Sequence, residues 1–165
     1  MTARAMIQIS RLERWGPLYA RIALGAAFLS AVAGRFGLWQ RTPSMKHFAD
    51  FIQYTAQVNS FLPAAVIPSL AWTATVAETT LGILLIVGLW PRWVSLASAI
   101  LLAMFGTAMA ISFGVKSPLD YSVFSASGAA VLLGLRPSRQ AREEQRKRPP
   151  NRFGDHGALD ESNLK

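Results

Sequence analysis

Glu78 is the residue with the clearest chemical potential, because it is a carboxylic acid inside a long apolar stretch. Between residues 51 and 115 the only charged side chains are Glu78 and Arg92. An ionised carboxylate at the centre of a membrane helix costs about 2.5–3.5 kcal/mol on insertion scales. Glu78 is therefore expected to exchange protons with, or hydrogen-bond to, a redox ligand such as a quinone. The structural alternative is a neutral carboxyl bonded to a hydroxyl or an arginine of a neighbouring helix.

A second candidate group lies near the outer ends of the apolar segments. Counting along these segments puts Arg35 level with Asp120 and Lys116. We expect an Arg35–Asp120 ion pair, because each charge would otherwise lie unpaired close to lipid. With Tyr121 and Trp39 beside it, this outer pocket would suit a planar headgroup. The same residues equally suit a plain interfacial belt.

Arg21 lies about one turn inside the first apolar segment. Its long side chain can reach the interface and anchor the helix there. It can also bend inward toward Glu78, although a vertical gap of roughly 10 Å argues against direct pairing unless the helices tilt.

Composition excludes several other chemistries. The chain has no cysteine, which removes disulfides, thiolate nucleophiles, iron–sulfur clusters and thiolate zinc sites. Its two histidines, His47 and His156, are expected on opposite sides of the bilayer, which argues against a bis-histidine haem. His47 has no carboxylate partner that would make a metal site. We therefore expect no metal and no cofactor within the chain itself, apart from contact with a quinone.

The apolar segments define an expected architecture. Hydrophobic residues make up 52% of the 165-residue chain and charged residues 16%, whereas soluble proteins have about 25% charged residues. A helix that crosses a bilayer needs about 20 apolar residues. Small residues repeat within these segments at helix-packing spacing, for example Ala23, Ala27 and Ala31 in the first segment and Ala71, Thr75 and Thr79 in the second. We expect an all-α, integral membrane four-helix bundle with spans at about 18–38, 68–89, 93–113 and 119–135. The second and third spans should form a helical hairpin at residues 89–92, because Pro91 lacks an amide donor and restricts Trp90.

Orientation follows from the basic residues, which accumulate on the cytoplasmic side of membrane proteins. With both termini inside, that side holds 13 Lys and Arg residues and the other side holds four. This predicts an N-in, C-in membrane protein, with residues 1–17 as a cytoplasmic juxtamembrane segment. A competing interpretation is a signal peptide cleaved after Ala33, because Ala31-Val32-Ala33 fits the cleavage pattern.

Two segments outside the spans have their own patterns. Residues 44–62 carry apolar side chains at three- and four-residue steps, which predicts an amphipathic helix on the outer surface, with a disordered loop as the alternative. Residues 136–165 are basic and poor in apolar residues, so we expect a disordered cytoplasmic tail. Its partner would be anionic lipid. No stacking aromatic residues accompany the charge, which argues against nucleic acid.

A set of short motifs resembles a known family. The motifs are Arg21-x-x-Leu24-Gly25, Phe28-Leu29-Ser30-Ala31-Val32-Ala33 followed by Arg35-Phe36-Gly37-Leu38-Trp39, Phe61-Leu62-Pro63, Glu78-x-x-x-Gly82 followed by Leu85, Gly88-Leu89 and Arg92, and Tyr121-Ser122-Val123-Phe124-Ser125. Over about residues 21–135 the chain resembles the DoxX family of small four-helix bacterial membrane proteins. The resemblance implies a protein of the bacterial cytoplasmic (inner) membrane, related to the small subunits of thiosulfate:quinone or quinol-oxidising complexes. Arg21, Glu78 and Arg92 match family positions, and Arg35 and Tyr121 match a narrower subgroup.

The leading hypothesis at this point is an accessory or quinone-contacting subunit of a membrane redox system, with other redox subunits as partners. In it, Glu78 handles the proton, and Arg21, Arg35, Asp120 and Tyr121 contact the cofactor. The alternative is a non-catalytic membrane scaffold that recruits a soluble enzyme through its basic tail. Whether the chain is itself an enzyme stays open.

Overall fold

The computed structural model describes residues 3–40 and 46–136, and every regular element within these ranges is helical. The described residues up to 135 form one compact unit, and the predicted tail lies outside the described residues from 137 onward. The elements in chain order are α1 (Ala3–Arg35), α2 (Lys46–Val58), the 3₁₀ turn η1 (Ala64–Val66), α3 (Ile67–Val87), α4 (Pro91–Phe113), α5 (Lys116–Asp120) and α6 (Val123–Gly134).

Three helical stretches are long and apolar enough to cross a membrane. They are residues 15–35 of α1, residues 64–87 (η1 with α3) and α4. A fourth apolar helix, α6, is shorter. These stretches overlap the four expected spans, so the prediction of an all-helical membrane bundle is confirmed.

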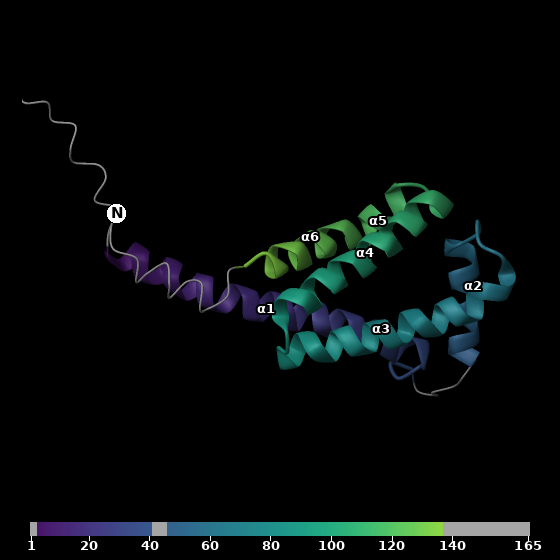
Figure 1. Cartoon of the computed structure of the whole chain (residues 1–165), viewed down its shortest axis with the longest axis horizontal. Helices are drawn as coiled ribbons and strands as arrows, with labels where there is room; N and C mark the ends of the chain where they lie inside the picture. Colours follow the sequence, from purple (N-terminus) through teal and green to yellow (C-terminus); the bar gives the residue numbers. More distant parts are fainter. Residues whose placement is uncertain (1–2, 41–45, 137–165) are drawn as a thin grey trace, which may run out of the picture. The chain divides into compact units, whose positions relative to one another are not determined.

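The helices pack as two close pairs, α1 with α3 and α4 with α6 (Figure 1). Glycines set the closest approach in the first pair. A Cβ added to Gly25 of α1 would lie 2.8 Å from the carbonyl oxygen of Gly82 in α3, and one added to Gly82 would lie 3.1 Å from the carbonyl oxygen of Gly25. The two backbones touch here because neither residue has a side chain, which is how membrane helices associate without a hydrophobic driving force.

A tight turn joins α3 to α4. Gly88 ends α3 in the left-handed conformation, with φ of 84°. Trp90 is also left-handed, with φ of 41°, and Pro91 then opens α4. Proline is well suited to the first turn of a helix, where its missing amide donor is not needed. The predicted helical hairpin at residues 89–92 is therefore present.

The segment expected as a fourth span is divided. Gly114 separates α4 from the five-residue helix α5, and Ser122, left-handed with φ of 55°, separates α5 from α6. The expected continuous helix over residues 119–135 is therefore wrong. The 12-residue helix α6 rises about 18 Å, which is well below the roughly 30 Å of a bilayer core.

Helix α2 lies across one end of the bundle (Figure 1) and packs against α1, α3 and α4. Its buried side chains are Phe48, Thr55 and Val58, which all belong to the predicted apolar face. The hydroxyl of Ser112 in α4 donates a 2.6 Å hydrogen bond to the carbonyl of Val58, the last residue of α2. The amphipathic helix predicted for residues 44–62 is confirmed, with the shorter bounds 46–58.

Candidate functional site

Arg35 and Glu78 form an ion pair inside the apolar bundle. Glu78 lies near the middle of the 21-residue helix α3, and Arg35 is the last residue of α1. The Arg35 Nη2 lies 2.8 Å from Oε1 of Glu78 and 2.7 Å from Oε2. The side chains are only 10% and 2% exposed. Only the Oε1 contact has hydrogen-bond geometry, so Oε2 is buried without a hydrogen bond among the described residues.

Thr75 completes the polar group. It precedes Glu78 by three residues on α3, so both side chains lie on the same face of the helix. Its hydroxyl accepts a 3.0 Å hydrogen bond from Nη1 of Arg35 and donates one of 2.8 Å to the carbonyl of Ala71. The guanidinium is thus fixed by two neighbouring side chains of one helix.

The opposite face of the guanidinium is covered by α2. The Cζ of Arg35 lies 3.8 Å from the centroid of the Phe51 ring, a distance at which the ring attracts the cation. Phe51 continues into an aromatic cluster, in which the Phe48 ring centroid lies 4.3 Å from that of Trp72 and 5.5 Å from that of Phe36. Arg35, Thr75, Glu78 and Phe51 are called the buried arginine site below.

Electrostatics make this arrangement costly to build. Moving two charges out of water costs several kcal/mol per ion even after relaxation, and their attraction repays this only with good geometry. The short Arg35–Glu78 contacts and the Thr75 hydroxyl supply such geometry. The site therefore holds a guanidinium with a defined orientation and a carboxylate with one oxygen available for another hydrogen bond.

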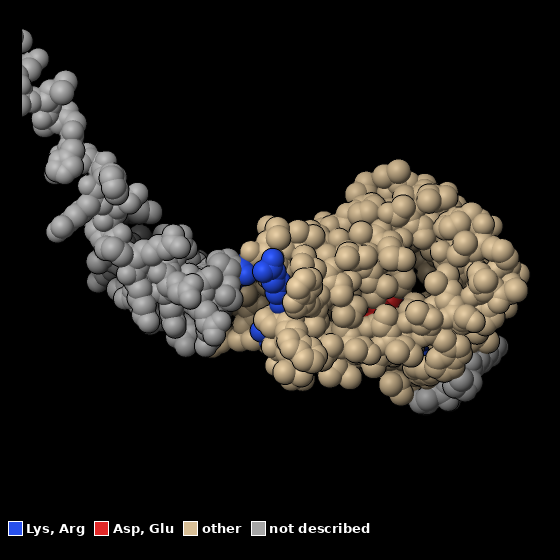
Figure 2. Space-filling view, viewed as in Figure 1, with Lys and Arg blue, Asp and Glu red and all other residues tan. Residues whose placement is uncertain are grey.

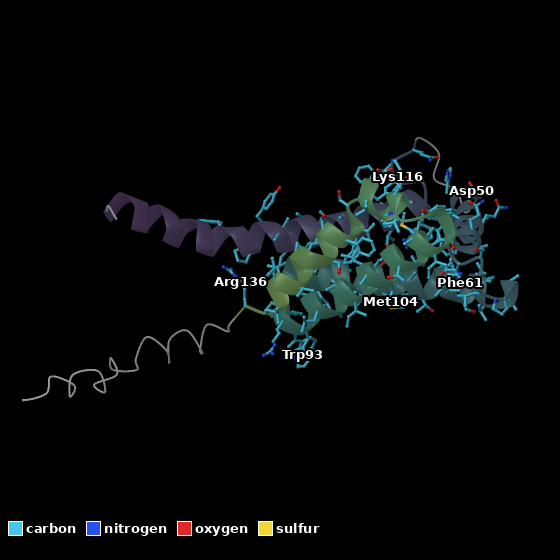
Figure 3. The ribbon with its side chains drawn as sticks, turned by 90° about the horizontal axis from the view of Figure 1, so that it is seen from above. Asp50, Phe61, Trp93, Met104, Lys116 and Arg136 are labelled. Atoms are coloured by element: carbon cyan, nitrogen blue, oxygen red, sulfur yellow. The ribbon has the colours of Figure 1, made fainter. Side chains whose placement is uncertain are left out.

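The expected outer pocket is not formed as predicted. The Arg35–Asp120 ion pair is wrong, because Arg35 pairs with Glu78, and Asp120 pairs with Lys116 one turn before it in α5. The reason is reach: α1 ends near the level of Glu78, and the long arginine side chain extends to that carboxylate. Figure 3 shows Lys116 near the end of the bundle, and both members of its pair are mostly exposed.

Tyr121 and Trp39 interact with residues outside the buried arginine site. Trp39 donates a hydrogen bond from its indole nitrogen to the carbonyl of Ser30. Tyr121 is exposed and faces Tyr54 of α2, whose pKa is raised by burial and, to a lesser degree, by Tyr121. Tyr54 in turn packs its ring against Phe113. The contacts of these aromatic residues fit an interfacial belt better than a headgroup pocket.

Arg21 has a structural contact instead of a place in the buried arginine site. Its Nε donates a 3.1 Å hydrogen bond to the carbonyl of Leu85, in the last turn of α3. A Cβ added to Gly88 would lie 2.1 Å from Nη2 of Arg21, so the guanidinium packs directly on the glycine that ends α3. A cation at this position satisfies a carbonyl without a helical partner and complements the helix dipole.

Replacing Arg21 with methionine should lower the free energy of unfolding by about 1–2 kcal/mol, because a charge-assisted hydrogen bond to the end of α3 is lost while apolar bulk is kept. Denaturant titration in mixed micelles measures this change. Tyr19→Phe on the same helix is the control, because Tyr19 is exposed and its replacement should leave the unfolding midpoint unchanged. Equal midpoints for Arg21→Met and wild type would contradict the capping role.

Comparison with known proteins now places the chain. The family described as methylamine utilisation protein MauE matches residues 13–120, which is more than half of the sequence. The chain belongs to the MauE family. No curated protein and no solved structure matches it. The matched residues of this MauE protein include α3, most of α1 and the buried arginine site, and with several apolar helices they establish a multi-pass membrane protein.

The assignment to the DoxX family is wrong, because the family found is MauE. The structure explains why the motifs misled. Gly25 and Gly82 form the close contact between α1 and α3, and Arg21 with Gly88 closes the end of α3. These are requirements of a packed membrane helix pair, and they carry no information about one particular activity.

Sequence analysis missed two members of the buried arginine site. Thr75 was interpreted only as a small packing residue, although its three-residue spacing from Glu78 places both on one helix face. Phe51 lies on the predicted amphipathic helix, where an aromatic residue on the apolar face gives no sign of a cation beneath it. The signal that was available is the Thr75–Glu78 spacing.

Proposed function

We propose that this MauE-family protein is a membrane component of a methylamine-utilisation system in which the buried arginine site binds the headgroup of a membrane quinone. The observation that carries this proposal is the Arg35–Glu78 ion pair, buried in an otherwise apolar bundle. The family description supplies the process, methylamine utilisation. The chemistry of the side chains suggests the ligand.

The presence of this ion pair favours a function over a purely structural role. Replacing a buried ion pair by apolar residues of similar volume is often neutral or stabilising. Ionisable residues inside membrane helices are costly and mark sites of ligand or proton handling. A small bundle whose helices already approach through Gly25 and Gly82 does not need a charged pair to associate.

The donors and acceptors fit a quinone headgroup, which is a flat ring bearing carbonyl acceptors. Arg35 presents guanidinium N–H groups held in place by Thr75 and Glu78. Glu78 adds a carboxylate oxygen that is buried without a hydrogen bond among the described residues. When bound, a quinone supplies electron transfer coupled to proton uptake. Arg35 would donate to its carbonyl oxygen, and Glu78 would give or accept the proton.

Phe51 indicates the face on which the ring would lie. Its own ring stands 3.8 Å from the guanidinium carbon, and flat rings stack favourably on guanidinium groups. A quinone ring that took this place would displace Phe51 and slide between α2 and the end of α1. We propose that the surface helix α2 moves aside to admit the headgroup from the membrane, against the Ser112–Val58 hydrogen bond that ties it to α4.

Location and partners follow from the same proposal. A quinone dissolves in the bilayer, so we place the protein in the bacterial cytoplasmic membrane beside other redox subunits. The non-catalytic scaffold remains the alternative, and it predicts that loss of residues 139–165 abolishes partner association while the quinone is irrelevant. That segment lies outside the described residues.

Two threonines of α3 provide a matched test. Both Thr73 and Thr75 bond to the carbonyl four residues earlier, but Thr75 also accepts from Arg35, and Thr73 is exposed. Gently purified protein should carry an isoprenoid quinone that mass analysis of its lipid extract detects. Thr75→Val should weaken quinone binding about tenfold, as expected for one lost hydrogen bond, and Thr73→Val should leave it unchanged. Quenching of tryptophan fluorescence, with Trp72 close to the site, follows the titration.

Glu78→Gln tests the proton step separately. The amide keeps the shape and can still accept from Arg35, but it cannot exchange a proton at neutral pH. We expect quinone binding to persist and quinone-dependent turnover in native membranes to fall at least tenfold. An absence of any bound quinone, or equal binding by the Thr75 and Thr73 variants, would overturn the proposed function.

A further inference from the structure

The turn between α3 and α4 carries an apolar groove at the end of the bundle opposite α2. Its lining residues are Leu81, Trp90, Trp93, Val94 and Ala97, and its volume is about 430 Å³. One turn of a helix 10–12 Å wide fills roughly 400–600 Å³. The groove is therefore too small for more than about one turn of a partner helix, and a thinner apolar chain suits it better.

Two tryptophans form the edge of this groove. Both are mostly exposed, at 71% each. Trp90 is held in the left-handed conformation directly before Pro91, a position that bulky residues rarely adopt. Strained backbone of this kind gathers at binding sites, where surrounding structure enforces it. Tryptophan also prefers the depth at which lipid headgroups meet acyl chains.

Among the described side chains, the charge beside the groove is basic. The guanidinium carbon of Arg92 lies 5.9 Å from the centre of the Trp93 ring, which lines the groove. Figure 3 shows Trp93 at this end and Asp50 at the other. The remaining acidic side chains described are Asp120, paired with Lys116, and the buried Glu78. Figure 2 shows that most of the described surface in this view is uncharged, with a few basic atoms and a trace of acidic ones.

We propose that this groove holds an acyl chain of an anionic phospholipid whose phosphate lies at Arg92. An apolar channel edged by tryptophans and flanked by an arginine matches such a lipid in both of its parts: the chain is buried, and the phosphate meets a guanidinium. The groove shares no residue with the buried arginine site or with the basic tail, since its lining residues are Leu81 of α3, Trp90 of the turn, and Trp93, Val94 and Ala97 of α4.

Competition between two lipids in native mass spectrometry tests the proposal on the full-length protein. Phosphatidylglycerol and phosphatidylcholine with identical acyl chains are supplied in equal amounts. We expect the wild type to retain phosphatidylglycerol preferentially, and Arg92→Gln to lower that preference about fivefold, as one lost arginine near the headgroups predicts. Lys116→Gln removes one cation at the opposite end and should leave the preference unchanged. The tail is present in every variant, so its own attraction for anionic lipid cancels.

A substitution that fills the groove tests whether the groove holds an acyl chain. Ala97 is exposed, so Ala97→Phe occupies the groove without entering the core, and it should lower retention of both lipids at least threefold with an unchanged circular dichroism spectrum. A phosphatidylglycerol carrying a photoreactive group on its chain should label peptides containing residues 81–97. Equal lipid preference in wild type and Arg92→Gln, or labelling confined to other helices, would overturn the proposal.

Discussion

Replacing Glu78 with alanine should lower the free energy of unfolding by about 3–5 kcal/mol, the range measured when one partner of a buried ion pair is removed. The remaining guanidinium of Arg35 would lie 10% exposed among apolar side chains with only Thr75 to accept from it. Unfolding by denaturant in mixed micelles, followed by helical circular dichroism, gives the change directly.

Removal of both charges separates the free-energy cost of an unpaired buried ion from the net contribution of the ion pair to stability. In the double variant Arg35→Met, Glu78→Leu, no charge is left unpaired, so most of the lost stability should return. The exposed pair of Lys116 and Asp120 supplies the contrast, since Asp120→Ala should cost less than about 1 kcal/mol. If the double variant were as unstable as Glu78→Ala alone, the ion pair would be needed for folding itself. Its presence would then no longer argue for a function.

Gly25→Leu should have an effect of comparable size, by pushing α1 away from α3. The first added carbon already meets the Gly82 carbonyl oxygen at 2.8 Å and a side-chain carbon of Ile86 at 2.7 Å. A backbone oxygen cannot rotate out of the way, so the helices must separate. Overpacking typically costs about 1–3 kcal/mol and occasionally more, and a full leucine at a backbone contact belongs at or above the upper end. The unfolding midpoint in mixed micelles measures it.

Gly128 of α6 provides the matched control, because a Cβ there would meet nothing within 4 Å. Gly128→Leu should be neutral or stabilising by up to about 1 kcal/mol, since leucine has the higher helix propensity. A Gly25→Leu protein as stable as Gly128→Leu would show that α1 and α3 do not depend on their glycine contact. A Gly82→Ala variant should fall between them, because the nearest atoms include the flexible side chain of Leu29 at 3.0 Å.

Sequence reasoning succeeded where one face of an element meets polar surroundings. The helix α2 was predicted from its apolar period, because its outer face carries exposed polar residues such as Asp50 and Gln53. The hairpin at Pro91 was predicted because proline and glycine act on the backbone locally. In both cases the decisive interactions lie within a few residues of one another.

Sequence reasoning failed where a residue's partner depended on how far one helix extends along another. The partner of Arg35 was wrong because the level at which α1 ends beside α3 cannot be read from either segment alone. The stripe of Ala23, Ala27 and Ala31 was also assigned to the wrong face, since all three are exposed, and the buried face carries Leu24, Gly25 and Phe28. Lipid and protein interior are equally apolar, so a membrane helix has little periodicity to reveal its packed side.

The division of the expected fourth span into α5 and α6 affects the surrounding lipid as well as the protein. A helix of 12 residues leaves roughly 12 Å of hydrocarbon unmatched along its axis. Lipids beside it must shorten or tilt their chains, at fractions of a kcal/mol per ångström of mismatch. The protein should therefore be most stable in bilayers of short-chain lipids and become less so as the chains lengthen, so that membrane thickness itself acts on the α4–α6 side of the bundle.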